Sequence, residues 1–238
     1  PEKHLVIDHS VSSGGYYCEL RGGEAILPEE IDWLERKMRE YVEANIPFKK
    51  AQVPLEEAKT LFETRGQHEK VQLLENRKKS HLILYSMGDH RDYHHGYMVP
   101  STGYLRDFSL VKAQNGFIMR FPQRRMPNQL GPAKFSPKLL ETFSQYRNWL
   151  NRLQVDSVGA LNQAIHGKRI REIVLVAEAL HELKIASIAQ QILEKKEEID
   201  LILIAGPSSS GKTTSSKRLT VQLIAQGITP YTLELDNY

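Results

Sequence analysis

The chain has 238 residues, of which 40% are hydrophobic and 26% are charged, and its formal net charge is +3. These values are typical of a globular chain of one to two domains, and the charge is too small to indicate nucleic-acid binding by itself. The single cysteine, Cys18, excludes an internal disulfide, and no apolar run approaches the roughly 18 residues of a membrane span, so we expect a cytoplasmic protein without a membrane partner.

The first half of the chain mixes strand patterns with helix patterns. Two helices are expected, at residues 28–45 and 54–65; the first begins at Pro28 with Glu29 and Glu30 in its first turn. Short apolar runs predict strands at residues 4–7, 16–20, 48–53, 71–74, 82–85, 105–111 and 117–121. This order predicts an α+β N-terminal domain with mixed or antiparallel pairing.

One segment of this half is rich in chemically active side chains. Three histidines and two aspartates fall within seven residues: Asp89, His90, Asp92, His94 and His95. They could bind Zn²⁺ or relay protons, or they could belong to a polar pocket or a surface loop. His94 and His95 are adjacent and would face opposite ways in a strand, so a closed metal site needs ligands from elsewhere, such as Cys18 or His9.

Prolines and basic residues mark the next segment. Pro122, Pro127, Pro132 and Pro137 break any regular element, which predicts a linker or an extended segment. Between Asp107 and Glu141 there is no carboxylate, whereas six basic residues occur there: Lys112, Arg120, Arg124, Arg125, Lys134 and Lys138. The stretch could contact RNA or phosphate, or it could be a solvated linker.

A helical connector should follow. Ser136 and Pro137 are suited to cap and open a helix that ends near Leu153, and a shorter helix is expected at residues 158–165. Residues 169–198 have a helical apolar pattern, which we expect to be interrupted near Lys184.

The motif with the clearest chemistry lies near the end of the chain. The apolar run at residues 201–205 predicts a buried strand, and a helix is expected at residues 215–226, ended by Gly227. The loop between them fits the pattern G-x-x-x-x-G-K-[ST], whose four fixed positions are Gly206, Gly211, Lys212 and Thr213.

This pattern is suited to a polyphosphate. Glycines let backbone N–H groups approach the anion, and the helix that follows adds free N–H groups and the positive end of its dipole. Lys212 would reach the β- and γ-phosphates and the Thr213 hydroxyl would ligate Mg²⁺. The expected ATP-binding residues are therefore Gly206, Pro207, Ser208, Ser209, Ser210, Gly211, Lys212, Thr213 and Thr214.

A second strand is expected at residues 231–235, followed by Asp236. An aspartate at the carboxyl end of a strand beside a phosphate loop lies where ligands bind in open α/β sheets, and it could accept a proton from an attacking hydroxyl. It could equally be an ordinary turn residue.

Residues 206–214 together with residues 235–238 resemble the opening of the uridine kinase and phosphoribulokinase family. The resemblance implies an ATP- and Mg²⁺-dependent kinase in which Asp236 is the base for the hydroxyl of a nucleoside acceptor. Because one strand, one helix and one strand cannot bury a parallel sheet, we expect this chain to be part of a longer protein. By itself it should bind nucleotide weakly and not turn over.

A second resemblance covers residues 1–121. Gly14-Gly15-Tyr16-Tyr17, the helix at 29–45, Arg65-Gly66-Gln67 and the segment 92–100 resemble the second additional domain of threonyl- and alanyl-tRNA synthetases. In the threonyl enzymes this domain hydrolyses mischarged tRNA through paired histidine and cysteine motifs. The resemblance places His94 and Met98 at one such pair, where a thioether replaces the expected imidazole.

Together these observations predict three regions. Residues 1–121 would be the synthetase-like domain, 122–198 a proline-rich linker and helical connector, and 199–238 the start of an α/β P-loop domain. The first functional hypothesis is phosphoryl transfer from ATP to a nucleoside, most simply uridine. The alternative is a tRNA- or RNA-binding, or aminoacyl-tRNA-hydrolysing, module with an accessory nucleotide-sensing loop.

Overall fold

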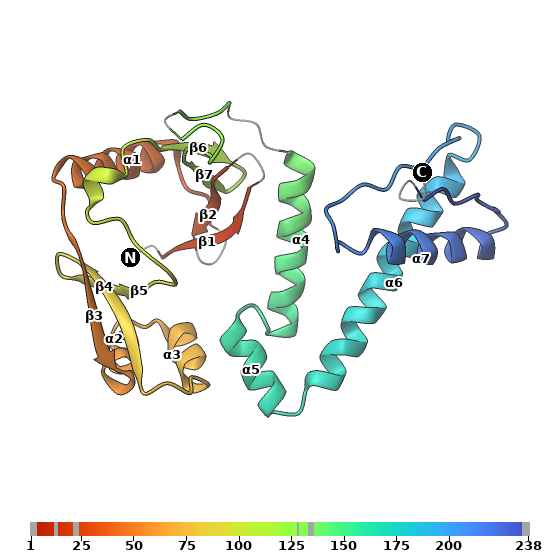
Figure 1. The fold of residues 1–238 in the computed structure, drawn as a ribbon. Coiled ribbons are helices and arrows are strands. Elements are labelled where there is room, and N and C mark those ends of the chain that lie inside the picture. Colours follow the sequence, from red (N-terminus) through yellow and green to blue (C-terminus); the bar gives the residue numbers. More distant parts are fainter. Residues whose placement is uncertain (1–3, 12–13, 21–23, 128, 133–135, 235–238) are drawn as a thin grey trace. The chain divides into compact units, whose positions relative to one another are not determined.

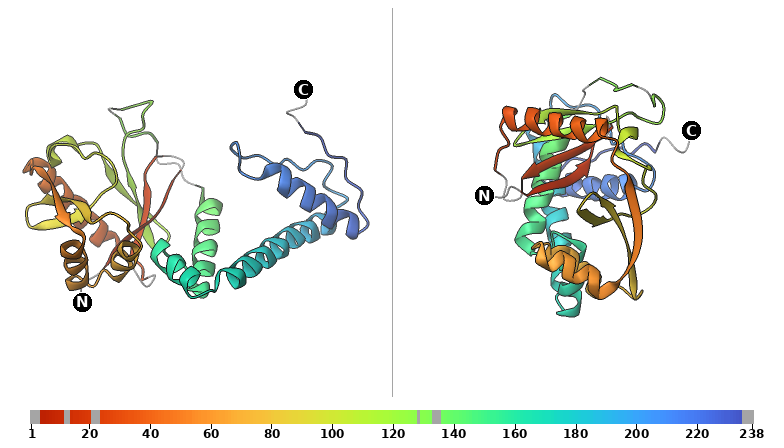
Figure 2. Two further views of the ribbon diagram at one scale, coloured as in Figure 1. Left: turned by 60° about the horizontal axis from the view of Figure 1, so that its bottom comes forward. Right: turned by 90° about the vertical axis from the view of Figure 1, so that its left-hand side faces the viewer.

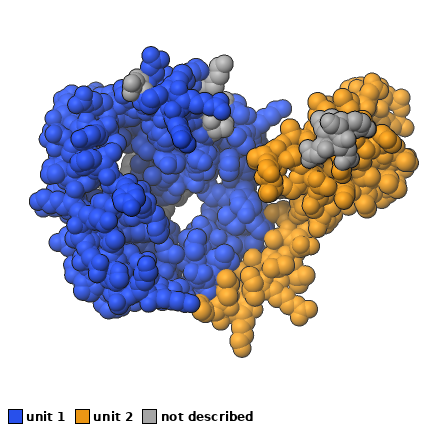
Figure 3. Space-filling model, in the orientation of Figure 1, with its two compact units in different colours: residues 1–163 blue, residues 164–238 orange. Residues whose placement is uncertain are grey.

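The computed structural model describes residues 4–11, 14–20, 24–127, 129–132 and 136–234 (Figure 1, with two further views in Figure 2). The chain divides into two compact units, residues 1–163 and residues 164–238 (Figure 3). We call them unit 1 and unit 2 and describe each by itself. No helix among the described residues is long and apolar enough to cross a membrane.

Unit 1 contains an antiparallel sheet in the order β1-β2-β7-β6. Its strands are β1 (Leu5–Ser10), β2 (Tyr16–Leu20), β6 (Ser109–Ala113) and β7 (Gly116–Arg120). Helix α1 (Pro28–Glu43) covers one face. The core between them is apolar and consists of Cys18, Leu20, Ile26, Ile31, Leu110 and Phe117.

Helix α1 begins as its sequence predicts. Pro28 occupies the first turn, and Glu29 and Glu30 follow it. The Glu30 carboxylate accepts a hydrogen bond from the backbone N–H of Leu27 at 3.0 Å, which satisfies a donor at the helix start.

A β-bulge in β1 places two neighbouring side chains on the same face of the sheet. Ile7 pairs with Cys18 and His9 pairs with Tyr17, so Asp8 is the extra residue of the bulge. Side chains normally alternate along a strand, but the bulge places Asp8 and His9 on the same face of the sheet. There Asp8 Oδ2 and His9 Nδ1 lie 2.6 Å apart.

Helix α4 (Pro137–Leu153) covers this face, opposite α1. Its first turn is capped by Ser136, whose Oγ accepts from the Leu139 N–H at 3.4 Å, as expected. Arg147 lies 3.1 Å from Asp8 and also pairs with Glu19, so a single guanidinium bridges strands β1 and β2.

A second antiparallel sheet in unit 1 has the order β3-β4-β5. It consists of β3 (Phe48–Pro54), β4 (His81–Met87) and β5 (His90–Tyr93), with helices α2 (Leu55–Thr64) and α3 (His68–Glu75) packed against one face. Their shared core contains Val53, Ala58, Phe62, Leu74, Leu82 and Leu84. The α+β class predicted for this part of the chain is therefore confirmed. Of the two kinds of pairing that the sequence allowed, mixed or antiparallel, the structure has the antiparallel one.

Three of the element predictions were wrong in detail. Residues 71–74 form part of α3 rather than a strand, because Val71 and Leu74 are one helical turn apart and both face the core. The strand predicted at 105–111 begins only at Ser109, after the short 3₁₀ helix η1 (Thr102–Tyr104). Helix α6 (Ile170–Glu194) continues through Lys184 without a break.

Unit 2 is built on two helices. Helix α7 (Lys212–Ala225) packs across the C-terminal half of α6. The contact is made by Ile185, Ala189, Leu219 and Leu223, with Ile192 and Ile228 at its edge. Helix α5 (Val158–His166) precedes α6 along the chain.

The two strands predicted in the P-loop region are absent from the described structure. Neither sheet of the described residues includes residues 199–205 or 231–234. Leu201 and Leu203 keep 70% and 81% of their surface exposed, which is the reverse of a strand buried on both faces. A strand exists only when a neighbour accepts its backbone hydrogen bonds, and no described segment does so here.

Candidate functional site

The predicted phosphate loop lies directly before α7. Gly211 has φ = +81° and immediately precedes Lys212, the first residue of the helix. Glycine takes this left-handed conformation without the steric cost that a Cβ would bring. The first backbone N–H groups of α7 have no intrahelical acceptor, so they are available to an anion.

Lys212 folds back over this loop. Its Nζ donates to the carbonyl oxygens of Gly206 at 3.0 Å and Pro207 at 2.9 Å. A Cβ added at Gly206 would lie 2.7 Å from Ser210 Oγ, so the loop closes tightly on itself. The structure therefore brings the two glycines and the lysine of the motif into one turn at a helix start.

The remaining motif residues are exposed to solvent. Ser208, Ser209 and Ser210 form the exposed turn, and Thr213 and Thr214 are exposed in the first turn of α7. Free N–H groups, an ammonium and hydroxyls at one loop fit a nucleoside triphosphate with Mg²⁺. Asp236, the predicted base, lies outside the described residues.

The histidine segment begins on β5 and continues into the loop after it. His94 and His95 are both exposed, and each approaches a different tyrosine: His94 lies 6.3 Å from Tyr85 and His95 5.5 Å from Tyr93, between ring centroids. Tyr93 pairs with Leu84 on the neighbouring strand, and both side chains join the core under α2 and α3. Tyr85 follows Leu84 in the strand and therefore points to the other face of the sheet, so the two tyrosines lie on opposite faces. The two imidazoles therefore diverge, although they lie in the loop after β5 and not in a strand.

The structure does not assemble the metal-site alternative. Within the described residues, no group of three or more histidine, cysteine, aspartate or glutamate side chains could hold a metal ion. Asp92 instead accepts from Lys70 Nζ at 2.6 and 2.7 Å. Cys18 and His9 belong to the other sheet and lie on its two opposite faces.

The loop after the histidines presents an aromatic side chain to solvent. Tyr97 is 95% exposed, and Lys50 Nζ lies 6.0 Å from its ring centroid. The Tyr85 hydroxyl donates to the Gly96 carbonyl at 3.0 Å and anchors the loop beside it. Met98 is half-buried at the position that the synthetase resemblance assigns to an imidazole.

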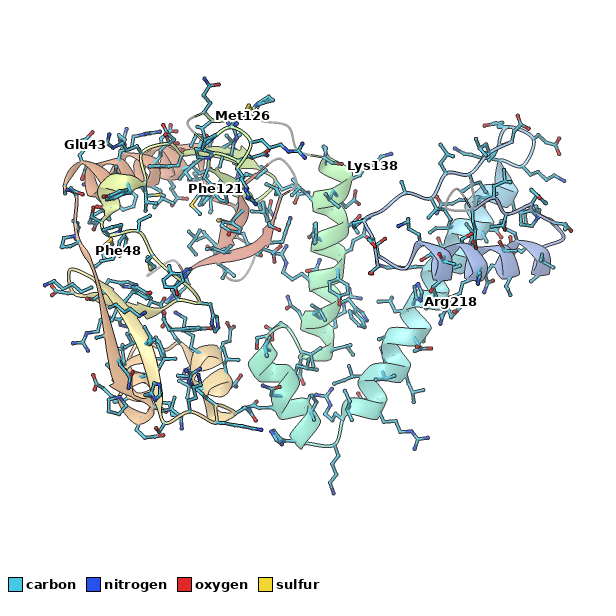
Figure 4. The ribbon with its side chains drawn as sticks, viewed as in Figure 1. Glu43, Phe48, Phe121, Met126, Lys138 and Arg218 are labelled. Atoms are coloured by element: carbon cyan, nitrogen blue, oxygen red, sulfur yellow. The ribbon has the colours of Figure 1, made fainter. Side chains whose placement is uncertain are left out.

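The basic stretch is partly structural and partly exposed. Lys112 Nζ donates to the Ile26 carbonyl at 2.7 Å, and Arg120 bonds Ser109 Oγ at 3.3 Å and the Gly131 carbonyl, so these two cations support the fold of unit 1. Those at the surface are Arg124 and Arg125, in the turn that ends at Met126, and Lys138 at the start of α4 (Figure 4). Lys134 lies outside the described residues.

Sequence patterns did not indicate one further feature of unit 1. A cleft of about 840 Å³ lies between the C-terminal part of α1 and the segment that includes η1. Its lining includes Arg39, Glu43, Asn45, Tyr104, Arg106 and Phe108. These residues come from two segments almost 60 positions apart and form no motif, so only the tertiary contact brings them together.

Comparison with known proteins relates part of the chain to one kind of enzyme. No family model matches the chain. It is 29% identical over 150 residues to a threonine–tRNA ligase of Syntrophotalea carbinolica, covering 63% of this chain and 23% of that enzyme. It is 32% identical over 108 residues to threonine–tRNA ligase 1 of Bacillus subtilis, covering 45% and 17% respectively.

The same relation recurs in a third organism. The chain is 33% identical over 118 residues to a threonine–tRNA ligase of Teredinibacter turnerae, covering 49% of this chain and 18% of that enzyme. The chain thus spans about a fifth of the length of the curated relatives it matches.

These comparisons do not support the kinase resemblance. About half of this chain is homologous to a part of threonyl-tRNA synthetases.

Proposed function

We propose that unit 1 is an RNA-binding module whose ligand is tRNA. The observation that supports this proposal is that about half of the chain is homologous to a part of threonine–tRNA ligases, which are named for tRNA as a substrate. It favours the alternative hypothesis raised by the sequence over the kinase hypothesis for this part of the chain.

The surface around the histidine segment supports this proposal. Tyr97 offers a free aromatic face on which an unpaired base can stack, and Lys50 lies beside it. His94 and His95 are exposed donors on the same loop. The proposal is binding rather than hydrolysis, because Met98 supplies a thioether that cannot act as a general base.

The test is filter binding of tRNA over a series of salt concentrations. RNA binding should weaken as salt rises, because cationic side chains displace counterions from phosphates. Tyr97→Ala should weaken binding roughly five- to hundredfold, from the loss of about 1–3 kcal/mol of base stacking. Tyr231→Ala, which removes an 86% exposed tyrosine of unit 2, is the matched control and should bind normally. Equal binding by both variants, or no binding at low salt, would refute the proposal.

We further propose that the loop of residues 206–214 binds ATP with Mg²⁺ and that the chain contributes this loop to phosphoryl transfer to a nucleoside. The geometry of Lys212, held over the loop carbonyls at the start of α7, favours this second function. Bound Mg²⁺ would supply charge neutralisation between the phosphates. Lys212 and the free N–H groups of α7 would hold the phosphates, Thr213 would face the ion, and Asp236 would take the proton of the acceptor hydroxyl.

Nucleotide titration tests the loop directly. Lys212→Ala should weaken ATP binding at least about tenfold, since a charge-assisted phosphate contact contributes more than about 1.4 kcal/mol. Lys217→Ala removes an exposed lysine of the same helix and should bind ATP normally. Transfer of isotopic γ-phosphate to a panel of nucleosides, with this chain and with any longer protein that contains it, then separates a kinase from a nucleotide sensor. Unchanged ATP affinity in Lys212→Ala would contradict the assignment.

A further inference from the structure

The cleft between α1 and the η1 segment is built from residues that belong neither to the histidine segment nor to the phosphate loop. Its volume of about 840 Å³ lies within the range of about 300–1,000 Å³ typical of small-molecule sites. Glu43, which lines the cleft at the end of α1, is labelled in Figure 4.

The walls of the cleft are fixed by buried hydrogen bonds. Thr102 is only 3% exposed, and its Oγ1 accepts from the Ile46 N–H at 2.8 Å. Ser101 Oγ donates to Asn45 Oδ1 at 2.5 Å. A Cβ added at Gly103 would lie 2.3 Å from Asn45 Oδ1, so the η1 segment packs directly on the end of α1. The cleft is therefore preformed, which lowers the entropic cost of binding.

Two guanidinium groups belong to this cleft. The Arg39 guanidinium lies 4.6 Å above the Phe108 ring. Its Nη2 donates to the Phe108 carbonyl at 2.9 Å, and its Nε and Nη2 both donate to Glu35 Oε1, at 3.2 and 2.5 Å. Arg106 Nε donates to the Gly103 carbonyl at 2.9 Å. Among the described residues, the terminal nitrogens of Arg106 have no protein partner. A fixed guanidinium beside one with free donors is suited to a phosphate, which accepts bidentate bonds.

The other lining groups complement a nucleoside. Tyr104 is 67% exposed and offers its ring for stacking, and Glu43 is an exposed carboxylate that can accept from ribose hydroxyls. Glu43 also disfavours a purely anionic ligand such as inorganic phosphate. The lining therefore fits a ligand that carries one phosphate, one sugar diol and one base.

We propose that this cleft binds a nucleoside 5′-monophosphate unit, either as a free nucleotide or as one residue of a single-stranded RNA. The phosphate contacts Arg39 and Arg106, the ribose contacts Glu43, and the base stacks on Tyr104. The RNA form rests on the proposed RNA-binding function; the free-nucleotide form does not.

The experiment is calorimetric titration of the full chain with a nucleoside 5′-monophosphate and, separately, with a short single-stranded oligoribonucleotide. All proteins carry Lys212→Ala, so that the phosphate loop does not add a second nucleotide site. Arg106→Ala should weaken binding of the ligand at least about tenfold. Arg36→Ala, which removes an exposed arginine of α1 outside the cleft lining, should leave binding unchanged.

Two further variants separate ligand contact from a loss of structure. Tyr104→Ala should weaken binding about five- to hundredfold, whereas Tyr104→Phe, which keeps the ring, should retain affinity within about threefold. Glu43→Gln should reduce the preference for a ribonucleotide over its 2′-deoxy analogue, a difference that misfolding would not produce. Unchanged far-UV circular dichroism confirms that each variant is folded.

The outcomes distinguish the two proposals for unit 1. If tRNA and the oligoribonucleotide bind the parent and every cleft variant equally, the cleft proposal is overturned and the RNA-binding function stands. If only the mononucleotide binds and the cleft variants lose it, the cleft takes a free nucleotide and the RNA-binding function fails. If neither probe binds the parent protein, the cleft proposal is overturned.

Discussion

At the scale of single residues, Cys18 illustrates how burial removes reactivity. The side chain is 1% exposed in the core under α1, and this burial raises the pKa of the thiol to about 11. A thiol with that pKa is neutral at physiological pH, whereas metal binding and nucleophilic attack need the thiolate. Cys18 is therefore a core residue, which excludes the ligand role that its sequence left open.

The raised pKa of Cys18 predicts how stability depends on pH. The ordinary value is 9.0, so below pH 9 the thiol is protonated in both states and contributes no pH dependence. Between pH 9 and pH 11 only the unfolded state ionises, and the folded state loses stability. By pH 10 the loss should be about 1.3 kcal/mol.

Urea unfolding at pH 8 and pH 10 measures this loss in the free energy of unfolding. The loss should be smaller in Cys18→Ala by the contribution of the thiol. The subtraction is needed because burial also raises the pKa of Tyr17 and Tyr93 above the ordinary value of 10.0, so their contribution to stability already begins to fall as the pH approaches 10. An equal loss of stability in both proteins would contradict the assignment to Cys18.

At Gly116 the neighbouring strand leaves no room for a side chain. A Cβ there would lie 1.9 Å from the Cys18 carbonyl oxygen on the neighbouring strand, so β2 and β7 must separate to admit it. Gly116→Ala should lower the free energy of unfolding by about 3 kcal/mol. Gly88→Ala is the control: its φ is +57° but no atom lies within 4 Å, so only backbone strain of about 1 kcal/mol should result. Chemical denaturation that ranks the two equally would contradict this account.

At the scale of elements, α4 belongs with the first sheet rather than with a separate connector. Leu140 is 3% exposed against that sheet, and the Phe143 ring stacks on His9 with 4.0 Å between centroids. The bulge turns His9 to the face on which Asp8 and Glu19 lie, and Arg147 contacts these two carboxylates on adjacent strands. An amphipathic helix needs a surface to cover, and the second face of the sheet provides it.

Removing the bridge should loosen α4. Asp8 and Glu19 are each only 14% exposed, so Arg147→Ala leaves two largely buried carboxylates close together and should cost about 3 kcal/mol of stability. Arg152→Ala removes an exposed arginine from the last turn of α4 and should cost less than about 0.5 kcal/mol. Thermal or urea unfolding checks both values. Comparable losses in the two variants would show that the bridge stabilises nothing.

At the scale of the whole molecule, the two units have very different cores. Unit 1 contains two sheets, each packed against helices, whereas the core of unit 2 is one contact between α6 and α7. The apolar side chains of residues 201–204 remain exposed in unit 2. Local stability follows buried apolar contact, so we expect unit 2 to open more easily than unit 1.

Hydrogen exchange tests this difference. Amides of residues 200–206 should exchange fast, because no sheet of the described residues includes them, while amides of β2 and β7 should be protected. ATP with Mg²⁺ should slow exchange at residues 207–215 and leave β2 and β7 unchanged. Strong protection at residues 200–206 without nucleotide would show that this run is paired after all.

Local signals in the sequence were sufficient for most elements of unit 1. Pro28 with its acidic first turn and Ser136 with Pro137 located the starts of α1 and α4, because capping depends on neighbours within one turn. The short run at 71–74 was misassigned because three apolar residues within four positions fit a helix as well as a strand. The loop at 206–213 could be found from its spacing for the same local reason.

The sequence alone determined the α+β class of unit 1, the helix starts and the turn in which Lys212 meets its glycines, since each depends on contacts between residues close in the chain. Only the tertiary structure decided that Arg39 and Tyr104 share a cleft and that His94 and His95 diverge. It also decided that, within the part of the chain that the structure describes, residues 201–205 pair with no strand and the histidines belong to no metal site. Strand pairing and clefts depend on partners distant in sequence, and local patterns do not encode where such partners lie.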